Sequence, residues 1–234
     1  MDEAFNINTE YLTDAELEQL SKHLDKYKEL HERDKLQGEF LEFVRHVWPS
    51  FIAGSHHKIF AEKLERVAKG ELKRLIVNMP PRHTKSEFAS YLFPAWVMGR
   101  DPHTKIIQAT HTAELAVGFG RKVKNLLDSE IYRDVFPEIE LARDAKASGR
   151  WSTNEGGEYY AVGVGGALAG RGANLCIIDD PVSEQDALSP TALDGIYEWY
   201  TSGPRQRLQP GGAIIIVMTR WSIRDLTAKV LQKQ

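Results

Sequence analysis

The sequence has a single cysteine, Cys176, among 234 residues, and it has no apolar run near the roughly 18 residues that suggest a membrane span. One thiol excludes both an internal disulfide framework and a zinc site built on cysteine ligands. Its position in the apolar run NLCIIDD indicates a small core residue. The N-terminus, MDEAFNINTE, is polar and acidic where a secretory signal carries basic residues and then an apolar stretch. We therefore predict a soluble intracellular protein with no membrane partner.

An excess of basic charge is also lacking, because 30 Lys and Arg side chains face 33 Asp and Glu, for a net charge of −3. This balance argues against a protein that coats nucleic acid by bulk electrostatics. It leaves DNA binding open, because a ring of subunits can focus a few basic side chains from each into one channel.

Hydrophobic side chains make up 42% of the chain, enough for one sizeable α/β domain with a short appendage. Apolar residues at helical spacing, together with capping and stop signals, predict helices at 13–31, 38–48 and 57–69. We expect an N-terminal helical arm over residues 1–48 and one compact core over residues 49–234.

From Lys73 onward, short β-rich runs alternate with helical stretches, which is typical of a parallel sheet with crossover helices. The predicted strands are 74–78, 105–110, 174–179 and 213–218, with a hairpin of 150–153 and 158–164. The predicted helices are 85–98, 112–127, 190–208 and 223–232. The predicted fold class is thus α/β, with a mainly parallel central sheet flanked by helices.

Glycine is absent where a phosphate-binding loop usually has it. The strand LKRLIVN leads into MPPRHTKS and then into a helical pattern, the context in which backbone N–H groups and a helix N-terminus face a phosphate. Lys85 would reach the β- and γ-phosphates, and Ser86 would bind Mg²⁺. The pattern GxxxxGK(S/T) expects glycine at Met79 and Thr84, and an ordinary strand-to-helix turn remains the alternative.

Two adjacent carboxylates end the apolar run NLCIIDDP, as in a Walker B strand. In that pattern Asp179 holds Mg²⁺ through water, and Asp180 orients or deprotonates the attacking water. The alternative is a pair of acids that caps a strand-to-loop junction. A Lys-Ser loop upstream favours the nucleotide site.

A third apolar run, GGAIIIVMTRW, ends in polar residues. In additional-strand P-loop ATPases, a polar residue at the end of the strand beside the P-loop strand senses the γ-phosphate. Thr219 is the candidate here and Arg220 is the second choice. An apolar strand followed by a capped helix would produce the same letters without this function.

The runs NMPPRHTKSE, LAGRGANLCIIDDP and VMTRW, in this order and at these intervals, resemble the ATPase domain of tailed-bacteriophage terminase large subunits. The resemblance covers most of the chain from about Trp48 onward. It implies an additional-strand P-loop NTPase that uses ATP and Mg²⁺ to drive double-stranded DNA into a procapsid. It also implies a homo-oligomeric ring in the host cytoplasm, with the portal protein and the terminase small subunit as partners.

Carried over residue by residue, the resemblance assigns the loop, the two acids and the sensor. The nucleotide-binding residues are Pro81, Arg82, His83, Thr84, Lys85 and Ser86, in which Arg82 is an additional phosphate or switch arginine. Ser86 and Asp179 become the metal ligands, Asp180 the catalytic carboxylate and Thr219 the coupling residue. Arg171, in the run GRG, matches a loop that can present an arginine to a neighbouring subunit's ATP. Its alternative is a loop arginine paired with a nearby acid.

Three positions depart from the family pattern. Many members have Gly where Thr84 stands, and a β-branched residue costs energy if the site needs a positive φ. Asp180 stands where many members have Glu, which has a longer side chain. His56 and His57 stand upstream, where motor ATPases often use Gln to read adenine; the pair contacts the base or is a partly exposed pair at a helix start.

Contacts with DNA are predicted for Arg121, Lys122 and Lys124, which would bind phosphates without reading bases; solvated surface is the alternative. We expect no nuclease activity, because the acidic residues of that domain would lie after the last residue, Gln234. No GxSxG elbow indicates a serine hydrolase.

Two other function classes compete with the motor. One is a non-catalytic nucleotide-binding or assembly module, favoured by the glycine-free loop. The other is a helicase-like ATPase, which should bring a second motor domain or aromatic stacking platforms for bases. The presence of Lys85, Ser86, Asp179 and Asp180 together favours the motor.

Overall fold

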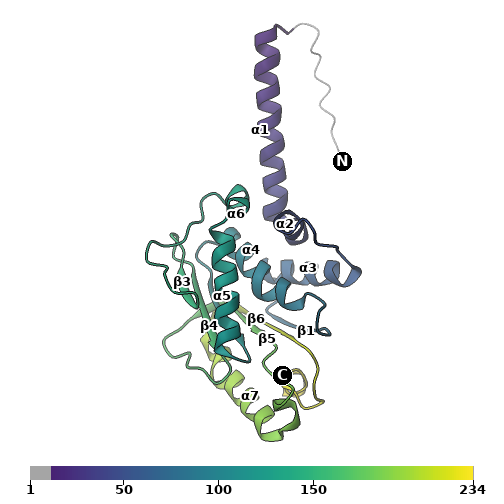
Figure 1. Ribbon diagram of the computed structural model, residues 1–234, viewed down its shortest axis with the longest axis vertical. Coiled ribbons are helices and arrows are strands. Elements are labelled where there is room, and N and C mark those ends of the chain that lie inside the picture. The colour runs from purple at the N-terminus through teal and green to yellow at the C-terminus, as the bar shows by residue number, and fades with distance from the viewer. Residues whose placement is uncertain (1–11, 234) are drawn as a thin grey trace.

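A computed structural model describes residues 12–233 (Figure 1). The helices, in chain order, are α1 (Asp14–Gly38), α2 (Phe40–Val47), α3 (Ser55–Ala68), the π-helical η1 (Glu87–Leu92), α4 (Phe93–Arg100), α5 (Ala113–Leu127), α6 (Glu130–Val135), the 3-10 helix η2 (Asp186–Leu188), α7 (Pro190–Ser202), the 3-10 helix η3 (Pro204–Arg207) and α8 (Leu226–Lys233). The strands are β1 (Arg74–Asn78), β2 (Lys105–Thr110), β3 (Arg150–Ser152), β4 (Glu158–Gly163), β5 (Ala173–Asp179) and β6 (Leu208–Met218).

The strands form one six-stranded sheet in the order β1-β6-β5-β2-β4-β3. All neighbours pair in parallel except β3, which forms the predicted antiparallel hairpin with β4. The predicted fold class, a mainly parallel α/β sheet flanked by helices, is confirmed.

Successive side chains of the inner strands enter two separate cores, as strand geometry requires. In β5, Leu175 and Ile177 pack with the core that contains α2, α3, α4 and α5. Cys176 and Ile178 pack with the opposite core, beneath α7 and α8. Burial on both faces explains why these strands are continuous apolar runs. It also raises the pKa of the Cys176 thiol to about 12, so this residue is an inert core side chain as predicted.

The register of the sheet brings the carboxyl ends of the inner strands to one edge. Val217 of β6 pairs with Val77 of β1 on one side and with Asp179 of β5 on the other. Asp179 in turn pairs with Thr110 at the end of β2. The loops that follow these strands therefore leave the sheet together, at the position where open α/β sheets bind ligands.

The N-terminal arm projects from the rest of the protein as the long helix α1 (Figure 1). It begins with a capping box between Thr13 and Glu16, and most of its side chains are exposed. Residues 1–11 of the predicted arm lie outside the described residues. No helix within residues 12–233 has both the length and the apolar character needed to cross a bilayer.

The second helix of the predicted arm packs into the main core. Phe40, Phe43 and Val44 of α2 are fully buried among side chains of α3, α4 and α6. Packing therefore continues across residue 48, and the division at that position remains a prediction.

The helix predicted over 85–98 is not one α-helix. Its first part, η1, is π-helical, and the N–H of Phe93 donates to the carbonyl of Phe88. Pro94 explains the change, because it has no N–H to donate to Ser90 and so disrupts the regular ladder at this turn.

Other element ends differ from prediction by local chemistry. The first helix continues from His31 to Gly38, and α7 ends at Ser202 because Gly203 and Pro204 follow it. The last helix begins at Leu226 rather than 223, after a turn closed by Asp225. The short α6 was not predicted, and β6 begins five residues earlier, at Leu208 rather than 213.

Phe40 tests whether α2 belongs to the core. Its ring centroid lies 5.5 Å from those of Phe88 and Phe93 and 5.4 Å from that of Trp96. Phe40→Ala should lower the free energy of unfolding by about 3–5 kcal/mol, because the cavity cannot collapse. The control Leu24→Ala, on the exposed face of α1, should change it by less than about 0.5 kcal/mol. Equal effects in denaturant titrations would show that α2 contributes nothing to the core.

Candidate functional site

The loop between β1 and η1 is held in an unusual backbone conformation. Arg82 has φ 63° and Thr84 has φ 58°. Across the loop, Asp180 has φ 42°. These are the non-glycine residues with positive φ within residues 12–233, and all three lie at the same edge of the sheet. Thr84, at a position where the pattern GxxxxGK(S/T) has glycine, therefore adopts the left-handed conformation with a β-branched side chain.

Lys85 points into the site and is 6% exposed. Its Nζ lies 2.8 Å from Oδ2 of Asp180. The other carboxylate oxygen of Asp180 accepts a hydrogen bond from the backbone N–H of Thr219, at 2.7 Å. One carboxylate therefore joins the β1 loop to the end of β6.

The first acid of the pair, Asp179, is 2% exposed and holds two hydroxyl groups. Ser86 Oγ donates to its Oδ1 at 3.0 Å, and Ser90 Oγ donates to its Oδ2 at 2.7 Å. Behind them, Gln108 Nε2 donates to Ser90 Oγ at 3.0 Å. Burial raises the pKa of Asp179 to about 6 against the hydrogen bonds from Ser90 and Ser86, and the charge of Asp180 adds to the rise.

Sequence reasoning missed Ser90 and Gln108. Both are fully buried polar residues inside otherwise apolar segments, in η1 and in the middle of β2. A polar residue at a buried position needs a hydrogen-bond partner, and this was the available signal. The π-helical turn that carries Ser90 had no clear sequence signature.

The oxygen atoms of Ser86 and Asp179 fit Mg²⁺, which prefers hard oxygen ligands. Within residues 12–233 there is no group of three or more His, Cys, Asp or Glu side chains that could hold a metal ion alone. A magnesium ion here would take its remaining ligands from phosphate and water, as in other phosphate-transfer sites.

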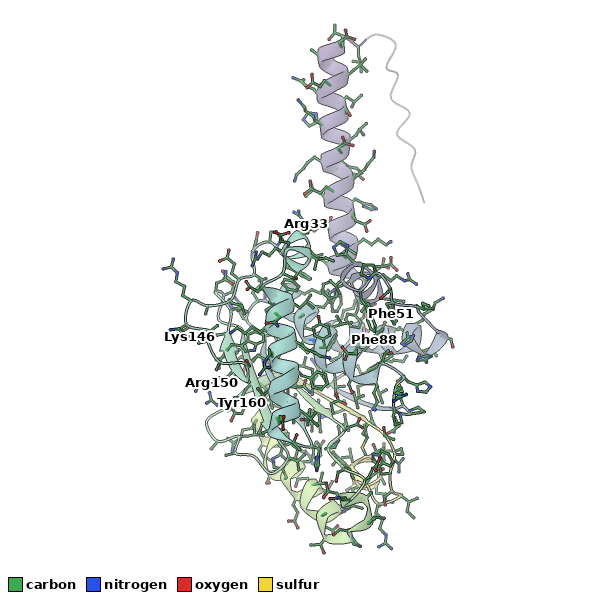
Figure 2. All side chains as sticks on the ribbon, viewed as in Figure 1. Arg33, Phe51, Phe88, Lys146, Arg150 and Tyr160 are labelled. Atoms are coloured by element: carbon green, nitrogen blue, oxygen red, sulfur yellow. The ribbon has the colours of Figure 1, made fainter. Side chains whose placement is uncertain are left out.

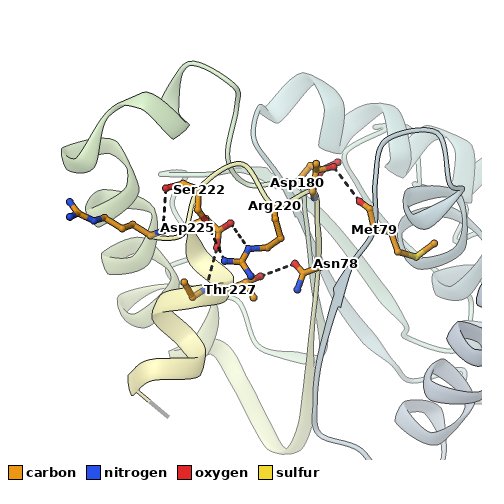
Figure 3. Close-up of polar contacts among 10 residues, drawn as sticks. Asn78, Met79, Asp180, Arg220, Ser222, Asp225 and Thr227 are labelled. Atoms are coloured by element: carbon orange, nitrogen blue, oxygen red, sulfur yellow. Dashed lines mark hydrogen bonds and ion pairs between the residues drawn. The ribbon is translucent and has the colours of Figure 1, made fainter.

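Of the two sensor candidates at the end of β6, Thr219 is the one that contacts the loop. Its hydroxyl lies 3.4 Å from the carbonyl oxygen of Met79. Arg220 is directed elsewhere, and its Nε lies 2.7 Å from Oδ2 of the fully buried Asp225. Arg220 therefore links the end of β6 to the turn before α8 (Figure 3).

His57 contacts the loop from the start of α3 and is 7% exposed. Its Nε2 lies 2.5 Å from Thr84 Oγ1, and its Nδ1 accepts the backbone N–H of Gly54 at 2.9 Å. The interpretation of His56 and His57 as a partly exposed pair is therefore wrong for His57, because both ring nitrogens are bonded within the protein. In the outer part of the loop, Pro81, Arg82 and His83 are exposed.

Arg171 does not reach the loop of its own chain. It precedes β5, whereas Asp179 ends that strand, and the six residue steps from Ala173 to Asp179 span about 20 Å. Its guanidinium lies 4.7 Å from the ring centroid of Tyr160 and lines a cleft with Arg150. Figure 2 shows Arg150 and Tyr160 away from Phe88, which adjoins the loop. Within one chain, Arg171 is not part of this site.

The three basic residues proposed for DNA contact lie on α5 but have different neighbours. Lys122 Nζ lies 2.8 Å from Glu87 Oε1, whereas Lys124 Nζ donates to the carbonyl of Ala145. Arg121 is exposed. Both lysines therefore already have a partner within the chain, and their contact with DNA remains a prediction, as it does for Arg121.

No protein-family model matches the chain, and no curated protein matches it in sequence. Among solved structures, the chain is similar to the large terminase of bacteriophage HK97, with a TM-score of 0.51 and 13% sequence identity. The match covers 78% of this chain and 36% of the terminase chain. The chain thus has a terminase-like fold and spans little more than a third of that protein's length.

The buried carboxyl of Asp179 should make stability depend on pH. Its pKa is about 6 in the folded protein, against an ordinary value of 3.8 for an aspartic acid in the unfolded chain. Between these two values the folded state holds a proton that the unfolded chain has released. Relative to Asp179→Asn, the free energy of unfolding in EDTA should fall by about 2 kcal/mol from about pH 4 to about pH 7. Parallel pH curves for the two proteins would refute the buried, desolvated carboxyl.

Proposed function

We propose that this protein is a terminase-type ATPase that couples ATP hydrolysis to the movement of double-stranded DNA into a viral procapsid. The observation that carries the proposal is the convergence of Lys85, Ser86, Asp179, Asp180 and Thr219 at the carboxyl edge of a parallel sheet. The likeness to a phage large terminase supports it at the level of the fold.

The loop after β1 is the element that would bind phosphate. Lys85 is a buried cation whose charge is balanced only by Asp180 in the contacts described, so phosphate oxygens can replace that carboxylate as its partner. The exposed Arg82 adds a second positive charge to the loop, with Pro81, His83 and Thr84 shaping it. Backbone N–H groups at the start of the following helix complete an anion site.

Ser86 and Asp179 would hold Mg²⁺, which when bound neutralises charge on the phosphates. Ser90 and Gln108 keep the Asp179 carboxylate in one orientation through the hydrogen bonds described above. Asp179 is therefore held in place by hydroxyl groups on both of its oxygens before any ligand binds.

Asp180 is the residue proposed for hydrolysis. Water attacks the γ-phosphorus, the bond to the β,γ-bridging oxygen breaks, and ADP leaves. When Lys85 turns toward phosphate, Oδ2 of Asp180 is released to accept the proton of the water, while Oδ1 stays bonded to Thr219. The same carboxylate thus responds to the nucleotide and contacts the end of β6.

Thr219 is placed to pass this change to the rest of the protein. It contacts Asp180 through its N–H and Met79 through its hydroxyl. The next residue, Arg220, is bonded to Asp225 before α8, and Thr227 of α8 donates to Asn78 at the end of β1, at 3.0 Å. A movement of the end of β6 would therefore also displace α8.

As a motor, the protein would work as a homo-oligomeric ring on the portal protein, with the terminase small subunit as a further partner, in the host cytoplasm. The wide separation between Arg171 and the loop of its own chain favours a role for this arginine in a neighbouring subunit.

The competing candidate is a nucleotide-binding assembly module without turnover. It is favoured by the two left-handed non-glycine residues in the loop, because strained backbone in the phosphate cradle would weaken ATP binding.

ATP binding and ADP release should separate these candidates when measured with Mg²⁺ across a range of protein concentrations. Lys85→Ala should abolish ATP binding, and Asp180→Asn should keep binding but lower turnover by about 10²-fold or more. The control Lys105→Ala, at the opposite end of the sheet, should resemble the wild type. If the wild type binds ATP no better than Lys85→Ala, the assembly module replaces the motor.

Mixing variants tests Arg171. Arg171→Ala should bind ATP normally and lose the turnover that increases with concentration, by a factor within about 10³–10⁵ for a full arginine finger. Adding Lys85→Ala, itself inactive, should restore turnover, because its Arg171 serves the neighbour's intact loop. Arg150→Ala, in the same cleft, is the matched control. Full activity of Arg171→Ala alone would exclude the finger.

A further inference from the structure

A threonine in the left-handed region is the least expected feature of the β1 loop. Thr84 has φ 58° immediately before Lys85, and this conformation costs an L-residue about 1–2 kcal/mol. A β-branched side chain is less suited to it than most. Such a residue keeps its conformation only when its surroundings impose it.

His57 supplies a directed hydrogen bond to that residue. Because Nδ1 accepts the backbone N–H of Gly54, the neutral ring carries its proton on Nε2 and donates it to Thr84 Oγ1, at 2.5 Å. The hydroxyl proton of Thr84 goes to the carbonyl of His83, at 2.7 Å. Each donor in this series of hydrogen bonds, from Gly54 at the start of α3 to the loop, therefore has an acceptor.

The imidazole is itself held by aromatic packing. Its centroid lies 4.8 Å from that of Phe51, in an edge contact, and 5.3 Å from that of Phe88. Figure 2 shows Phe51 and Phe88 close together, and Phe88 is fully buried at the start of η1. His57 therefore has a fixed position on the same packed layer from which the helix after the loop begins.

The neutral form that this geometry needs is also the favoured one. Burial lowers the pKa of His57, and the nearby His56 and His83 lower it further.

We propose that His57 is a positioning residue for the phosphate-binding loop. Its hydrogen bond holds Thr84 in the conformation that glycine adopts in related loops. The hydrogen bond to Oγ1 is available only to a hydroxyl side chain, so His57 and Thr84 act as a pair that replaces one glycine. The importance of this pair for nucleotide binding rests on the proposed ATPase function. The hydrogen bond between the two residues, and its effect on the loop conformation, do not depend on that function.

The pair predicts non-additive effects in a double-mutant cycle. His57→Phe keeps an aromatic ring beside Phe51 and Phe88 but removes both hydrogen bonds. It should weaken Mg-ATP binding by about 10-fold in the wild-type background and by less than about twofold when combined with Thr84→Gly. His57→Gln, which can still donate a proton to Oγ1, should recover part of the affinity, and Lys58→Ala, an exposed change on the same helix, should have no effect.

Equal losses from His57→Phe in both backgrounds would overturn the proposal, because they would mean that His57 only supports packing. A second measurement does not depend on ATP. Backbone amide exchange at Lys85 and Ser86 should be about 10-fold faster in His57→Phe than in the wild type, and this difference should vanish beside Thr84→Gly. If the wild type does not bind ATP, the ATPase proposal fails while the exchange cycle still decides whether His57 positions the loop.

Discussion

The ion pair between Lys85 and Asp180 joins the strand ends on which the site is built. Lys85 belongs to the loop after β1, Asp180 follows β5, and the second oxygen of Asp180 holds the N–H of Thr219 after β6. The parallel register of these three strands makes the contact possible, because it ends them at the same edge of the sheet. Loss of that register would separate all the proposed catalytic groups at once.

Energetically unfavourable features are concentrated at this edge. Thr84, Arg82 and Asp180 have a left-handed backbone conformation. The carboxyl of Asp179 is almost completely buried, and burial raises its pKa to about 6. Each would be costly in isolation. The surrounding hydrogen bonds and the two packed cores offset this cost, and such concentration is typical of sites selected for chemistry rather than for stability.

Two structural supports flank the site, on either side of β1. On one side, His57 and the aromatic layer of Phe51 and Phe88 hold the loop from α3. On the other, the bond between Thr227 and Asn78 ties α8 to the end of β1. The loop therefore lies between the aromatic layer and a strand end that is bonded to α8. The proposed coupling of phosphate loss to helix movement would use this connection.

The sequence by itself determined the order of the elements and the residues at the strand ends, because apolar periodicity and short polar motifs are local properties. The strands 74–78 and 105–110, the hairpin and the placement of Lys85, Asp179 and Thr219 all followed from it. Only the tertiary structure decided which partners these groups have. Arg220 is bonded to Asp225, Arg171 lies far from its own loop, and Ser90 and Gln108 support Asp179. These contacts join residues distant in sequence, so they depend on sheet register and helix packing that no local pattern encodes.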